Sequence, residues 1–259
     1  MRMMKKVLGT VTVLALSASL LAGCGSTAAS PVSSAASTAA ESTTSSVVSE
    51  TTSAAADENV AAAAQLLNDL TGSYQELWPV ILADEYQQTW LDDCTALVGE
   101  ENAEAAFEKL SSMVTGDVYG EDAVEAYANG GGAYFCGFTN DLATLTFDGE
   151  TSTISGTDKD GNVLFSHTYH YIGMEPVRGL YEFESDDADS GEFTYFFLAP
   201  DTSAETYHIE FRYGSDAEAL SQYDAGEYAY WVASGISTDC DQTMIDNCIE
   251  LFCTENLAG

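Results

Sequence analysis

The hydrophobic pattern of the chain changes its period once, at the Asn-Gly-Gly-Gly run of residues 129–132. Before this run, apolar residues recur every three or four positions, which is typical of helices with one packed face. After it, aromatic and β-branched residues alternate with polar ones between frequent turn residues, which is typical of short antiparallel strands. Consecutive glycines stop a helix because they reach left-handed backbone conformations easily. We therefore expect helices first and strands afterwards.

The segments predicted as helices before the run share a stripe of large apolar side chains, and they are 60–70, 73–82, 84–98 and 101–114. The segments predicted as strands alternate with period two, and they are 133–138, 142–148, 163–172, 179–184, 193–198, 206–213 and 227–233. A last helix is predicted over 241–253. Sequential short strands of this kind predict an α+β fold, with an antiparallel up-and-down β-barrel, N-terminal helices and a C-terminal helix.

Residues 1–23 have the features of a lipoprotein signal peptide, because a short apolar run follows three basic residues and ends in small residues before Cys24. The apolar run is too short to span a membrane comfortably. We expect a lipid on Cys24 that anchors the mature protein outside the cytoplasm, at the cell membrane. The alternative is an ordinary secretory signal that is cleaved nearby.

Residues 24–57 follow as a tether. Between 25 and 56 the chain is almost entirely Ser, Thr and Ala, with little apolar surface to bury. Chain entropy is expected to keep such a segment disordered. The predicted folded domain is therefore 58–259, long enough for one substantial core.

Charge narrows the range of partners. Three of the seven basic residues lie in the signal peptide, which leaves four against 42 acidic residues and a net charge of −38. Nucleic acid and anionic membrane surfaces would be repelled by such a chain, so neither is an expected electrostatic partner. The acidity attracts cations weakly, and most of it is expected to be a solvated surface.

Several stretches resemble one known family. They are 67–79 (LNDLTGSYQELWP), 169–173 with 177–183 (YHYIG, VRGLYEF), 207–216 (YHIEFRYGSD) and 228–231 (YAYW). Their order and spacing are similar to those of the ZinT (YodA) metal-binding domain, which also occurs in zinc-capturing lipoproteins of Gram-positive bacteria. The resemblance implies a calycin-like barrel, zinc or another divalent metal ion as ligand, and a metal ABC transporter as partner.

The chain departs from the family at the strand that carries metal ligands in the family, where two histidines flank one residue. Only the second is present, as His208, because Thr206 stands in the first place and Phe196 stands where a further histidine is expected. A site of three imidazoles therefore cannot be carried over. Zinc also accepts carboxylate oxygens, so a compensated site is chemically feasible.

Strand geometry limits the compensation, since only residues two apart share a face. His208 shares its face with Glu210 and Arg212. Either His208 and Glu210 bind a cation there, or Arg212 pairs with Glu210. His167 and His170 lie on opposite faces of their strand, so they cannot both face the interior. Each of them is a candidate to join His208 across strands, or else a packing or surface residue.

Cysteine usage leaves a second question open. Beyond Cys24 there are five cysteines, an odd number, so at least one is free or pairs between chains. Export favours disulfides. The group at 240–253 can form one internally or link the last helix to Cys94 or Cys136. Inert burial of the thiols and thiolate metal binding are the alternatives.

Nothing in the sequence assembles an enzyme active site, since neither a nucleophile elbow nor a nucleotide-binding glycine loop is present. Three hypotheses remain. The first is a membrane-anchored metal-binding protein, with zinc at a site around His208. The second is a calycin-type module that binds a small organic ligand in an aromatic interior. The third is a structural or interaction lipoprotein that has lost the metal.

Overall fold

A computed structural model describes residues 47–199 and 208–258, with side chains from residue 58 onward. Eight strands form a closed barrel in which each strand pairs antiparallel with its neighbour in sequence, and β8 pairs with β1. The strands are β1 Gly72–Glu76, β2 Thr144–Asp148, β3 Thr153–Thr157, β4 Val163–Met174, β5 Tyr181–Ser185, β6 Tyr195–Leu198, β7 His208–Gly214 and β8 Ala233–Ser237. The predicted α+β class and calycin-like up-and-down barrel are confirmed.

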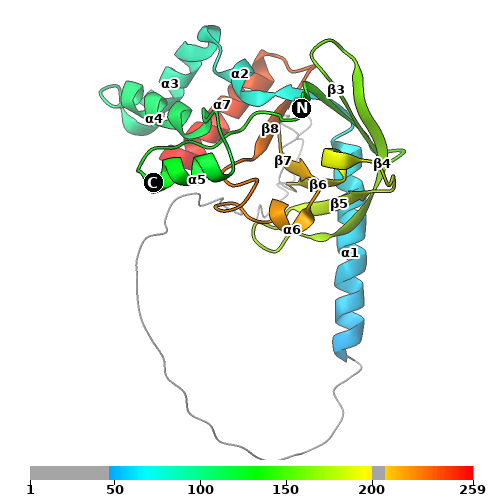
Figure 1. Ribbon diagram of the computed structural model, residues 1–259. Helices are drawn as coiled ribbons and strands as arrows, with labels where there is room; N and C mark the ends of the chain where they lie inside the picture. The colour runs from blue at the N-terminus through cyan, green and yellow to red at the C-terminus, as the bar shows by residue number, and fades with distance from the viewer. Residues whose placement is uncertain (1–46, 200–207, 259) are drawn as a thin grey trace, which may run out of the picture. The chain divides into compact units, whose positions relative to one another are not determined.

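Most helices of the described residues gather on one side of the barrel. These are the helices between β1 and β2 and the one after β8, whereas α1 meets the barrel elsewhere and extends away from it, and the short α6, between β7 and β8, lies apart from both (Figure 1). The helices are α1 Val47–Asp69, α2 Leu77–Ile81, α3 Gln87–Val98, α4 Ala103–Val114, α5 Glu121–Ala128, α6 Ala217–Leu220 and α7 Gln242–Leu257, with short 3-10 turns at Asp84–Tyr86 and Gly191–Phe193.

The barrel interior is filled by aromatic side chains. Phe183, Phe196 and Tyr213 occupy matching positions on three neighbouring strands, and all are at most 1% exposed. Phe165 stacks on Phe193 with ring centroids 4.0 Å apart. Burying each such ring contributes about 1.5–3 kcal/mol, and the ring contacts add to this. The interior is therefore a packed core.

A second core lies between the barrel and the helices. It combines apolar residues of α2, α3, α4 and α7 with Ile236 of β8, and Trp90 at its centre donates a hydrogen bond from Nε1 to Ile81 O at 2.7 Å. Its aromatic contacts include Trp78 with Phe252, whose ring centroids are 4.8 Å apart. This core, which we call the helical layer, covers one outer side of the barrel.

The predicted strand 133–138 is wrong. This segment makes isolated bridges from Phe135 to Thr115 and Trp231 and is part of no barrel strand. Its main chain bonds to irregular neighbours, since Tyr134 N donates to Met113 O at 2.8 Å and Phe135 N donates to Tyr230 O at 3.0 Å. The alternation in the sequence therefore reflects a short extended segment that is too irregular to form a continuous ladder.

Three further strand positions were displaced or missed. The predicted strand 227–233 is irregular, because Tyr230 has a φ of 57°, and β8 starts only at Ala233. The strand β1 lies where a helix over 73–82 was predicted, and only its second part, α2, is helical. The strand β3 was not predicted, because its small side chains carry little apolar signal.

The N-terminal part of the chain is described from Val47, where α1 begins, inside the segment predicted as a tether. The signal peptide and Cys24 lie outside the described residues. Among the helices that are described, none combines the length and the apolar character needed to cross a membrane.

We predict that Gly149→Ala lowers the free energy of unfolding by about 1–3 kcal/mol through steric overlap. A Cβ at Gly149 would lie 2.4 Å from Cα of Asn68 and 2.6 Å from Leu67 O, both main-chain atoms at the end of α1. The measurement is urea unfolding followed by circular dichroism. Gly173→Ala is the control, since its Cβ would lie 3.5 Å from the nearest atom, Glu182 Oε2. Equal stability of both variants would contradict the docking of α1 on the β2–β3 turn.

Candidate metal-binding pocket

A small pocket lies between the outer face of β7 and the helices α2 and α7. Its volume is about 40 Å³, enough for an ion or a water molecule but not for an organic ligand. We call it the β7–α7 pocket. Its polar lining consists of His208, Glu210, Cys248 and Glu255, and its apolar lining of Leu77, Trp78, Ile81, Leu251 and Phe252.

The two strand residues reach this pocket because of the alternation of β7. Ile209, Phe211 and Tyr213 belong to the barrel core, so the residues between them point outward. At the start of the strand, the outward residues His208 and Glu210 meet the helical layer. The structure thus brings together two of the residues that the sequence proposed as ligands, on the outside of the barrel.

The two helix residues reach the pocket because they lie seven positions apart on α7. Seven residues are close to two helical turns, so Cys248 and Glu255 share one face. Burial raises the pKa of the Cys248 thiol to about 12, which keeps it protonated at neutral pH. Sequence reasoning did not propose these residues for a site with His208, because no local pattern links α7 to β7.

An imidazole, two carboxylates and a thiol are all donors that zinc accepts, and calcium or magnesium prefers only the carboxylates. In the described residues, no group of three or more His, Cys, Asp or Glu side chains is already arranged around one point as a metal site. Metal binding in the β7–α7 pocket therefore requires the donors to move toward one another.

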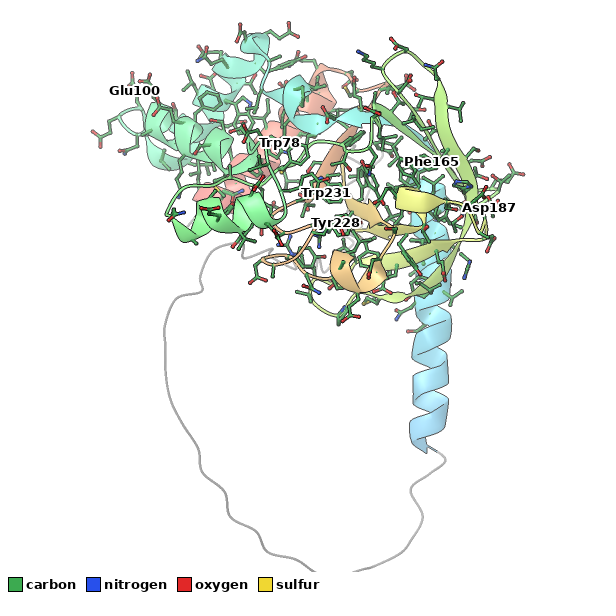
Figure 2. The ribbon with its side chains drawn as sticks, in the orientation of Figure 1. Trp78, Glu100, Phe165, Asp187, Tyr228 and Trp231 are labelled. Carbon is green, nitrogen blue, oxygen red and sulfur yellow. The ribbon has the colours of Figure 1, made fainter. Side chains whose placement is uncertain are left out.

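The other two candidate histidines lie elsewhere. His167 Nδ1 is 2.7 Å from Asp187 Oδ2, and His170 Nδ1 is 2.7 Å from Asp186 Oδ1. Both histidines are on β4, which β5 and β6 separate from β7. In Figure 2, Asp187 lies at the edge of the barrel, well away from Trp78, which lines the β7–α7 pocket. The prediction that either histidine joins His208 is therefore wrong in this structure.

Arg212 lies on the same outer face of β7 as His208 and Glu210, but toward the other end of the strand. It is fully buried, and its Nη groups donate hydrogen bonds to the carbonyl oxygens of Leu220, Gln222 and Tyr228. Burial lowers its pKa to about 10, so it remains charged at neutral pH. These bonds hold the segment before β8 against the barrel. The role of the guanidinium is therefore different from the pairing with Glu210 that the sequence left open.

A second arginine contributes to the attachment of this segment to the barrel. The guanidinium carbons of Arg178 and Arg212 lie 4.0 Å and 4.4 Å from the centroid of the Tyr223 ring. The buried Glu175 accepts hydrogen bonds from the main-chain N–H groups of Val177 and Arg178 at 2.8 Å and 2.6 Å. Two of the few basic residues of the chain therefore have a structural role, through cation–π contacts and carbonyl bonding.

The barrel interior, where the second hypothesis places an organic ligand, is packed with aromatic side chains in the part of the chain that the structure describes. Two pockets of this part of the chain lie outside the barrel. The larger one, about 420 Å³, is an open depression lined by Tyr119, Gly120, Glu121, Asp122 and Glu227. Its acidic rim matches the overall charge of the chain.

Comparison with known proteins gives two structural likenesses. No protein-family model and no curated protein matches the chain. The Zn(II)-bound ZinT-like domain of Streptococcus pneumoniae AdcA is 17% identical, with 71% of this chain and 89% of that chain covered and a TM-score of 0.45. Zn(II)-bound AdcA from the same organism is 16% identical, with 72% and 35% covered and a TM-score of 0.42. Both likenesses are distant, and the fold described above rests on this chain's own strand pairing.

We predict that Arg212→Lys lowers the free energy of unfolding by about 2–4 kcal/mol, because a single ammonium group cannot replace the guanidinium fork at several carbonyl oxygens. Arg178→Lys is the matched control. Its side chain is partly exposed, and we expect a loss below about 1 kcal/mol. Chemical unfolding measures both. A loss for Arg212→Lys no larger than that of the control would contradict the fastening role.

Proposed function

We propose that this chain is a lipid-anchored extracytoplasmic protein that binds a divalent metal ion, zinc by preference, in the β7–α7 pocket. The observation that carries the proposal is the composition of that pocket. His208 and Glu210, selected from the sequence as ligands, face Cys248 and Glu255 across a space of about 40 Å³.

Zinc suits this set of donors better than calcium or magnesium does. Nitrogen and sulfur donors favour zinc, and zinc tolerates four ligands in a tight tetrahedral arrangement. The Cys248 thiol would lose its proton on binding, because the thiolate is the form that ligates metal. A bound cation would also relieve the repulsion between the two carboxylates.

Location and partner follow from the N-terminal sequence and from the family resemblance. A lipid on Cys24 would keep the domain at the membrane, where a metal ABC transporter is the proposed recipient of the ion. The net charge of −38 after the signal peptide favours accumulation of cations near the protein, without selecting among them. We propose a binding role, with no catalytic step.

The metal proposal is tested by calorimetric titration of zinc into the mature chain carrying Cys24→Ala, with excess calcium and magnesium to occupy weak acidic sites. We expect one-to-one binding with a dissociation constant below 1 μM, on the order of that expected for a site with several protein ligands. His208→Ala is expected to weaken binding at least about tenfold, a loss of about 1.4 kcal/mol.

The control for this titration is His170→Ala. It removes an imidazole that lies beside Asp186, away from the β7–α7 pocket, and is expected to leave zinc affinity unchanged. Weak binding at several sites, equal in all three proteins, would reject the pocket as a metal site. It would favour the third hypothesis, a structural or interaction lipoprotein.

Anchoring is tested separately with Cys24→Ser in the full-length chain expressed in a bacterium that processes lipoproteins. We expect the wild-type protein in the membrane fraction and in the detergent phase of a phase separation, because its lipid partitions with detergent. The variant is expected to lose both properties. If wild type and variant distribute alike, Cys24 does not carry the anchor.

A further inference from the structure

The five cysteines of the described residues all lie in the helical layer or at its edge. Each is a thiol in this structure, and four of them are buried. The group contains Cys94 on α3, Cys136 before β2, Cys240 just before α7, and Cys248 and Cys253 on α7. Such a concentration in one small core is unusual for a chain that we expect to be exported, where thiols meet an oxidising environment.

Two of these thiols are in contact. The Sγ atoms of Cys94 and Cys253 are 3.9 Å apart, although the residues are 159 positions apart in sequence. Both side chains are 0% exposed. The helices that carry them, α3 and α7, pack directly on each other. Side-chain rotation and a small adjustment of the helices would bring the sulfurs to bonding distance, about 2.05 Å.

The remaining cysteines have other surroundings. Cys248 lines the β7–α7 pocket. Cys136 Sγ is 3.9 Å from the carbonyl oxygen of Tyr134, and Cys240 stands immediately before the helix-capping Asp241. The sequence left open whether the last helix is linked internally, to Cys94 or to Cys136. The packing of α7 on α3 favours Cys94 as the partner.

We propose that the exported protein carries a disulfide bond between Cys94 and Cys253, which links α3 to α7. The bond forms by thiol–disulfide exchange with the disulfide of an extracytoplasmic thiol oxidant. Each cysteine loses one proton, a sulfur–sulfur bond forms between them, and the oxidant takes up two electrons and two protons to become a dithiol. Cys136, Cys240 and Cys248 remain thiols.

Complete burial determines when this exchange happens. Thiolates attack disulfides, and neither sulfur is accessible once α3 and α7 have packed. The exchange therefore takes place during folding, before the helical layer closes. The finished bond is inaccessible to reductants in the folded protein and becomes reducible only after unfolding.

The inference rests on the extracytoplasmic location in the proposed function and is independent of metal binding. The disulfide would constrain α7, the helix that also presents Cys248 and Glu255 to the β7–α7 pocket. A bond to α3 would hold that helix against the layer and leave the Cys248 thiol available.

The test is peptide mapping of the full-length protein recovered from the membrane fraction. Free thiols are alkylated in denaturant without reductant, and the chain is cut with a glutamate-specific protease. Glu250 separates Cys248 from Cys253, and Glu100 and Glu125 separate Cys94 from Cys136. We expect a linked pair of peptides that contain Cys94 and Cys253, with the other three cysteines alkylated.

Two results would overturn the proposal. One is alkylation of both Cys94 and Cys253 before any reduction. The other is a linked pair that joins either of them to another cysteine. Neither result depends on zinc, so failure here is distinguishable from failure of the metal site. Failure of location is read from the membrane partitioning of the same sample.

A measurement of thermal stability complements the peptide map, and it uses both a double variant and the wild type. The double variant Cys94→Ala/Cys253→Ala is expected to melt about 5–10 °C below the oxidised wild type. Cys136→Ala, which removes a buried thiol outside the pair, is the control for loss of packing. Reductant is expected to lower the melting temperature of wild type only after exposure to denaturant. Equal melting of wild type with and without that treatment would contradict the bond.

Discussion

Closure of the barrel by the pairing of β1 with β8 is the constraint on which the remaining structure depends. Tyr74, Gln75 and Glu76 pair with Ser237, Ile236 and Gly235. These strands come from opposite ends of the folded part of the chain. The strand β1 leads directly into α2, and β8 is followed by α7, so the pairing brings α2, α3 and α7 together on one side of the barrel (Figure 1).

The helical layer that results changes the chemistry of the outer face of the barrel. Outward residues of a barrel strand usually meet solvent, but on β7 only Glu210 is exposed, whereas His208 is half-buried and Arg212 is buried. At the start of the strand, His208 and Glu210 face α2 and α7, where they form the polar lining of a pocket. At its other end, Arg212 is buried, and its Nη groups donate to carbonyl oxygens of the segment 220–228. One strand thus contributes both a candidate binding site and a structural fastening, and its inward residues complete the aromatic core.

Regular elements were predictable where one physical signal dominated. The apolar stripes of α3 and α4 and the alternation in β4 were sufficient, because each of these elements buries one face only. The alternation in β7 was also sufficient, because its inner face is apolar and its outer face is polar. Prediction failed at 133–138 and 227–233, where aromatic residues alternate but the main chain is mostly irregular, with isolated bridges at Phe135 and Trp231. It also failed at β3, whose Gly156 makes room for the ring of Phe165 and so carries no apolar signal of its own.

The sequence by itself determined which side chains of each strand share a face, because that parity depends only on neighbouring residues. It also determined which donor side chains are available to a metal, and that histidine is scarce among them. Only the tertiary structure decided that the apolar face of β7 points inward and that the face of His208 points toward α7. It alone decided that Cys94 lies beside Cys253, and that His167 and His170 lie beside Asp187 and Asp186. These outcomes depend on contacts between residues far apart in sequence, which form only when the barrel closes and the helices pack against it.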